Sequence, residues 1–201
     1  MAKASWVKTT PSSGSGDATV NVSSTTTHTG RKARTSVLTF KAANVADVQR
    51  TVNQAGKPAY VDIADAASAD KAGKVVTISG VSNAKNLTFA LGSGDLESIS
   101  LPATYVANSL TTNNGADISG DPGASAEYNF AISITVPAND GTQPLTRQII
   151  VTDESGNRDV CLLTLAAGDA YITVAEGDIE LDYLGTAVAV QVKSNTSWTV
   201  E

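Results

Sequence analysis

An internal repeat constrains this chain more than any other feature of its sequence. Residues Gly73 to Asn83 align without a gap with Gly185 to Asn195, 112 positions further along. A second stretch, Arg34 to Tyr60, aligns with Arg147 to Tyr171 after small deletions. Such self-similarity is the signature of an architecture built from similar units. One copy is therefore intact, from about Tyr60 to Ala170, whereas the other is split, with its beginning at the C-terminus and its end at the N-terminus.

The residue pattern within each copy predicts an all-β fold. Apolar residues alternate with polar ones from Ala18 to Val22 and from Tyr128 to Val136, with the two-residue period of a half-buried strand. Turn residues separate about seven short strands per copy, and only residues 64–72 fit a short helical turn as well as a loop. This pattern is typical of immunoglobulin-like β-sandwiches. We predict two such domains, a middle domain at residues 58–170 and a split domain formed discontinuously from residues 1–57 and 171–201.

The split domain needs the two ends of the sequence to meet. Left unpaired, the C-terminal strand would expose an apolar face and unsatisfied edge hydrogen bonds. The tail can fold back onto residues 6–56 of its own chain, which needs only a short gap between Glu201 and Met1 and is the arrangement we favour. It can equally complete a neighbouring subunit. The residues expected to close the domain are Trp6, Trp198, Val188, Val190 and Val192.

Composition excludes several classes of function. The net charge is −6 and the basic residues are scattered apart from Arg31, Lys32 and Arg34, so a nucleic-acid partner is disfavoured. No apolar stretch approaches the ~20 residues that cross a bilayer, and we expect no membrane insertion. The N-terminus has no apolar segment typical of a secretory signal, so we expect synthesis and use in the cytoplasm unless a signal has been removed. Cys161, the single cysteine, lies in an apolar run and is expected to be a buried, inert thiol.

The split copy resembles the BACON domain, an immunoglobulin-like module of Bacteroidetes proteins and of phages that infect these bacteria. The resemblance rests on a Ser-Asn pair followed by Trp198, a second tryptophan at Trp6, a Gly-x-Gly turn at Gly14, an arginine-led strand from Arg34 and a final strand that ends near Gly56. The order is rotated, because the tail carries the part that comes first in the family. His28 stands near a position where the family usually has asparagine, and the middle copy lacks both tryptophans.

This resemblance implies a role in binding or in building a scaffold. The family is named for carbohydrate binding, although most copies resemble spacers or adhesive scaffolds. Together with the missing signal and the complementary ends, it suggests an auxiliary or decoration protein on the capsid exterior of a crAss-like phage, made in the host cytoplasm. The expected partners are the major capsid protein or other virion proteins, and copies of the chain itself. The alternative is a carbohydrate-binding or adhesive module of a secreted or cell-surface protein, with Trp6 and Trp198 contacting surface glycans.

No enzymatic chemistry is predicted. His28 is the only histidine and lies in a Ser/Thr-rich turn. A catalytic relay or a histidine metal cluster could not be assembled without this residue. The acidic pairs Asp153 with Glu154 and Glu176 with Asp178 lack the spacing of a calcium loop. We therefore expect no catalytic residues, no cofactor and no metal site.

Overall fold

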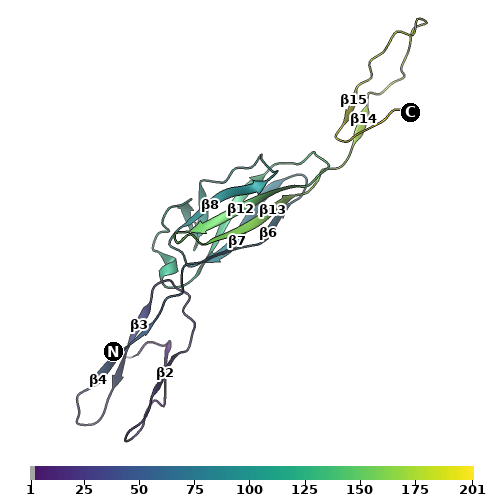
Figure 1. The fold of residues 1–201 in the computed structure, drawn as a ribbon. Helices are drawn as coiled ribbons and strands as arrows, with labels where there is room; N and C mark the ends of the chain where they lie inside the picture. Colours follow the sequence, from purple (N-terminus) through teal and green to yellow (C-terminus); the bar gives the residue numbers. More distant parts are fainter. Residues whose placement is uncertain (1–2) are drawn as a thin grey trace.

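The computed structural model describes residues 3–201, and a complete β-sandwich occupies its middle (Figure 1). Two sheets form this sandwich, and a single 3-10 turn, η1 (Pro122–Ala124), interrupts the strands. The first sheet has the order β10 (Leu110–Asn113), β9 (Thr104–Ala107), β11 (Tyr128–Val136), β7 (Lys74–Ser82) and β5 (Val61–Ile63). The second has the order β6 (Ala66–Ala69), β13 (Arg158–Leu165), β12 (Leu145–Asp153) and β8 (Leu87–Gly94). The predicted all-β sandwich fold is confirmed.

Alternation along β11 builds the core of the middle sandwich. Phe130, Ile132, Ile134 and Val136 are buried, and the residues between them face outward. Phe130 makes an edge contact with Phe89 across the core, with ring centroids 5.9 Å apart. Burial of such side chains contributes about 1.5–3 kcal/mol each. Cys161 lies in the same core and is fully buried, in agreement with its assignment as a small hydrophobe.

Residues 64–72, for which the sequence left a helical turn and a loop open, contain a strand. β6 pairs in parallel with β13, from Ala66 opposite Leu162 to Ala69 opposite Leu165. The preceding strand, β5, pairs instead with β7 in the other sheet. The chain from Val61 to Ala69 therefore contributes one strand to each sheet of the sandwich. The strand β6 forms because the edge of β13 supplies backbone hydrogen-bond partners, which the local sequence does not reveal.

Two hairpins precede the middle sandwich and one follows it. The N-terminal hairpins pair β1 (Val7–Thr10) with β2 (Asn21–Ser24) and β3 (Arg34–Phe40) with β4 (Val48–Gln54). The C-terminal hairpin pairs β14 (Ile172–Val174) with β15 (Val192–Ser194). Each hairpin is a sheet of its own, without a hydrogen-bonded strand from any other part of residues 3–201.

The two ends of the chain lie on opposite sides of the middle sandwich (Figure 1). The N-terminal hairpins extend from one end of the sandwich, and the C-terminal hairpin extends from the other. Folding of the tail back onto its own N-terminal segment, the arrangement favoured from the sequence, is therefore not present in the structure. The short gap that self-closure would need is not found between the two end segments, because the intact domain separates them.

Candidate functional site

The C-terminal hairpin has the same strand register as the first hairpin of the middle sandwich. In the middle sandwich, Val61 pairs with Ser82 and Ile63 with Gly80. In the tail, Ile172 pairs with Ser194 and Val174 with Val192. The two hairpins correspond residue for residue when β5 is shifted by 111 positions and β7 by 112. The tail, residues 171–201, thus has the structure of the opening of a sandwich, and we call it the donor tail.

The turn before the second strand is repeated as well. In the middle sandwich the Asp70 carboxylate accepts a hydrogen bond from the amide of Ala72, and Gly73 turns the chain at φ 72°. In the donor tail the Asp182 carboxylate accepts a bond from the amide of Leu184, and Gly185 turns the chain at φ 69°. Positive φ favours glycine, which explains why glycine occupies the position in both copies.

Two asparagines attach each unit to the one before it. Asn83 Oδ1 accepts a bond of 3.0 Å from the amide of Tyr60, and its Nδ2 donates to the carbonyls of Thr29, Lys57 and Pro58. Asn195 Oδ1 accepts a bond of 3.0 Å from the amide of Tyr171, and its Nδ2 donates to the carbonyls of Asp140 and Asp169. The donor tail is therefore joined to the middle sandwich as the middle sandwich is joined to the N-terminal segment.

The N-terminal segment corresponds to the closing part of the middle sandwich. His28 Nε2 lies 2.6 Å from the carbonyl of Lys32, and Asn139 Nδ2 donates to the carbonyl of Gln143 in the same place. β3 and β4 pair with Arg34 opposite Gln54, in the register that places Leu145 opposite Leu165. From His28 to Gln54 a constant shift of 111 residues relates the two, so Arg34 corresponds to Leu145 rather than to Arg147. We call residues 3–57 the acceptor half.

The acceptor half has an open groove beside its apolar residues. A cavity of about 680 Å³ opens between its two hairpins and is lined by Val20, Leu38 and Phe40 among others. Phe40 is 43% exposed, whereas Val151, its counterpart in the middle sandwich, is fully buried. Most residues that line this cavity are exposed, so it is an open groove rather than an enclosed void. The acceptor half therefore lacks the side chains that would cover its apolar face.

The five residues predicted to close the split domain are not brought together within one chain. Trp6 is half-buried, and the guanidinium of Arg34 lies 4.6 Å from the centre of its ring. Trp198 and Val188 in the donor tail are each 49% exposed, and Val190 and Val192 are half-buried. A β-sandwich domain rarely exposes so much apolar surface unless a partner covers it.

The two end segments carry opposite charge. Residues 1–57 contain eight lysine and arginine residues and two aspartates, whereas residues 171–201 contain five acidic residues and one lysine. The overall negative charge of the chain conceals this asymmetry. Opposite patches of this kind favour and orient association.

A charged clamp holds the acceptor half on the middle sandwich. The Arg31 guanidinium donates to both carboxylate oxygens of Asp121, at 2.8 and 3.0 Å, and lies 3.3 Å from the Glu154 carboxylate. Partial burial opposes ionisation of Asp121, but the hydrogen bond and charge of Arg31 outweigh it and lower the pKa of this carboxyl. This clamp accounts for the cluster of Arg31 and Lys32, which the sequence left without a role.

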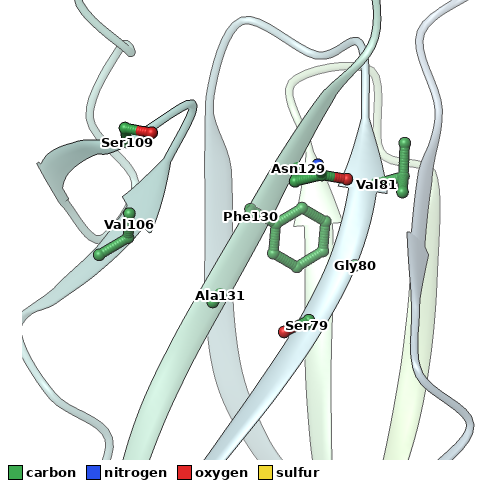
Figure 2. Close-up of a pocket in the computed structure, with 8 residues that line it drawn as sticks. All are labelled: Ser79, Gly80, Val81, Val106, Ser109, Asn129, Phe130 and Ala131. Atoms are coloured by element: carbon green, nitrogen blue, oxygen red, sulfur yellow. The ribbon is translucent and has the colours of Figure 1, made fainter.

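A shallow hollow of about 530 Å³ lies on the outer face of the first sheet of the middle sandwich, beside Ser79, Val81, Val106 and Asn129 (Figure 2). Figure 2 shows the Phe130 ring beside Gly80, where a side chain on residue 80 would meet the ring. Its lining contains no titratable side chain, so it offers contact surface rather than reactive groups.

The polar groups considered for chemistry are separated from one another. Within residues 3–201, no group of three or more histidine, cysteine, aspartate or glutamate side chains is placed to hold a metal ion. Burial raises the pKa of the Cys161 thiol to about 11, which makes it a poor nucleophile at neutral pH. The same part of the chain contains no helix long and apolar enough to cross a membrane.

Comparison with known proteins gives a family match and a structural likeness. Residues 1–55 match the BACON family, described as "Putative binding domain, N-terminal". No curated protein matches the chain. Cadherin-like domains 1 to 4 of zebrafish RET are a structural neighbour, with 8% sequence identity and a TM-score of 0.35. The aligned region covers 69% of this chain and 34% of that one, so the chain spans about a third of the neighbour's length.

Proposed function

We propose that this chain is a non-enzymatic structural protein that decorates the exterior of a phage capsid through β-sandwich and strand-mediated contacts. The observation that supports this function is the pair of open half-sandwiches at opposite ends of a complete one. Among residues 3–201, each has strand edges without a hydrogen-bonded neighbour and an exposed apolar face, and proteins recruit strands from partners through such edges. The BACON match supports the broader assignment as a binding module.

The capsid assignment makes the virion the place to test it. Mass spectrometry of purified phage particles should detect the chain in many copies, and mild protease treatment of intact particles should remove it. Its major partners would be the major capsid protein and other virion proteins. Absence from purified particles, or protection from protease until the capsid is opened, would contradict a position on the capsid exterior.

A carbohydrate-binding or adhesive module of a secreted or cell-surface protein is the second candidate. The exposed indole of Trp198 favours it, because exposed indole rings stack on sugars. A glycan array with the full chain, with Trp198→Ala and with Trp6→Ala distinguishes the two functions. Binding to defined glycans that is lost in either variant would favour this candidate, whereas a blank array would favour the capsid protein.

A further inference from the structure

We propose that the donor tail of one copy completes the acceptor half of a second copy, so that the chains assemble head to tail. The proposal rests on the strand-mediated contacts proposed above and names their partner as another copy of this chain. Joined in this way, the two segments supply one full repeat, with the opening hairpin from one copy and the closing hairpins from the next.

The first argument is the match between missing and available strand edges. In the middle sandwich β7 pairs with β11, and β6 pairs in parallel with β13. The counterparts of β7 and β6 in the donor tail are residues 186–194 and 178–181. Their expected partners in the acceptor half are β2 and β4. β2 is bonded only to β1, and β4 only to β3, so the edges that would receive the tail are free of other strands of residues 3–201.

The second argument is the fit of apolar side chains. Val76 and Ile78 of β7 are buried in the middle core, and their counterparts are Val188 and Val190. In the acceptor half, Val20 and Leu38 line a cavity where such side chains would lie. Docking removes both apolar faces from water at once.

The third argument is a reciprocal change of side-chain size. In the middle sandwich Phe130 lies opposite Gly80, which leaves room for the ring. The inward residues of the N-terminal strand follow a shift of 112, because Ser24 lies opposite the buried Val7 and the residues two, four and six positions before it share its face. Ala18 then takes the Phe130 position, and the donor tail has Val192 at the Gly80 position. The large side chain and the small one have exchanged sides, so the pair keeps a packable volume.

Charge and geometry both favour a second copy over self-closure. The acceptor half is basic and the donor tail acidic, so each end of the chain attracts the opposite end of another. Within one copy the middle sandwich separates the ends (Figure 1). A head-to-tail interface uses different surfaces on the two subunits, and it produces rings or open filaments according to the rotation at each joint.

Two full-length variants that each lose one half of the interface provide the test. Val188→Lys with Val190→Lys blocks the donor tail, and Val20→Lys with Val22→Lys blocks the acceptor half. Analytical ultracentrifugation should show concentration-dependent oligomers for the wild type and a monomer for each variant alone. An equimolar mixture should form a dimer and nothing larger, because only one intact donor and one intact acceptor remain.

Matched controls place the same charges on outward positions of the same strands. Ala187→Lys with Ala189→Lys, and Asn21→Lys with Ser23→Lys, should both assemble as the wild type does. A wild type that remains monomeric at all concentrations, or a mixture of the blocked variants without a dimer, would overturn the proposal.

A disulfide test on otherwise unblocked chains identifies the contact directly. Val190→Cys in one copy and Val20→Cys in another should form a mixed dimer under mild oxidation, whereas Ala189→Cys with Val20→Cys should not. Equal yields from the two pairs would count against the proposed pairing. Head-to-tail assembly without incorporation into the virion would leave this inference intact and contradict the capsid assignment. Incorporation of a strictly monomeric chain into the virion would support the capsid assignment and contradict head-to-tail assembly.

Discussion

Asn83 and Asn195, 112 positions apart, make equivalent hydrogen bonds at the two joints of the chain. Each accepts a bond from the amide of a tyrosine that opens its unit, Tyr60 or Tyr171, and each donates to carbonyls of the preceding unit. The acceptor half, the middle sandwich and the donor tail are thus successive units of one tandem arrangement. Within residues 3–201, the first unit contains the closing part of a repeat and the last unit contains the opening part.

Replacement of Asn83 should destabilise the chain more than replacement of Asn195. Asn83 is fully buried and bonds to four backbone groups, so Asn83→Ala leaves buried partners unsatisfied and should cost about 2 kcal/mol or more of unfolding free energy. Asn195 lies in the more exposed tail. Urea unfolding should show a clear loss for Asn83→Ala and nearly wild-type stability of the middle sandwich for Asn195→Ala, and equal losses would contradict the structural difference between the joints.

The joint held by Arg31 and Asp121 should weaken in acid. Because the pKa of Asp121 is lower in the folded state than its usual value near 4, its stabilising contribution is complete above about pH 4 and is lost as the pH falls through the folded-state pKa. The hydrogen-exchange protection factors of the Arg31 and Lys32 amides, which bond to Gly123 and Ala124, should therefore fall below pH 4. In the Asp121→Asn variant, the contribution of this carboxyl to the pH dependence should be absent. A pH profile identical to that of the wild type would exclude the Asp121 carboxyl as the cause.

The core and the outer face of the middle sandwich should respond differently to truncation of a side chain. Phe130 is buried against Phe89, and Phe130→Ala should cost about 3–5 kcal/mol. Val106 lies exposed on the rim of the outer hollow, so Val106→Ala should change stability by less than about 0.5 kcal/mol. Thermal unfolding measured by circular dichroism compares the two. Similar melting temperatures would show that the core assignment is wrong.

Cys161 should resist alkylation in the native protein. Its thiol is fully buried and its pKa is raised to about 11, so very little thiolate is present at pH 7.5. A maleimide should modify it only in denaturant, and the modification rate in water should follow opening of the core. Rapid labelling without denaturant would contradict its burial.

The two tryptophans should report on assembly independently. Trp198 is half-exposed in the single chain, so its fluorescence in a Trp6→Phe variant should shift to the blue as the protein concentration rises and the tail becomes covered. In Trp198→Phe, the emission of Trp6 should change less, because Arg34 already covers its ring. A Trp198 spectrum that is independent of concentration would be inconsistent with a covered tail.

Local patterns in the sequence determined the elements of this protein and their repetition. The alternation in β11 and the match of Asn83 with Asn195 were both readable, because strand period and repetition depend on local sequence. The strand β6 was not readable, since its hydrogen-bond partner β13 lies far away in the sequence. The small deletions placed in the second alignment were also unnecessary, since strand pairing relates Arg34 to Leu145.

The tertiary structure alone decided where the two ends lie. The sequence identified Val188, Val190, Val192, Trp6 and Trp198 as parts of one repeat, but it assigns no distance between segments separated by a folded domain. The intact sandwich has its entry and exit at opposite ends, and the equivalent asparagine joints direct the flanking halves away from each other. The repeat relationship of the two ends was therefore a property of the sequence, whereas their placement on opposite sides of the middle sandwich arises only when that domain is folded.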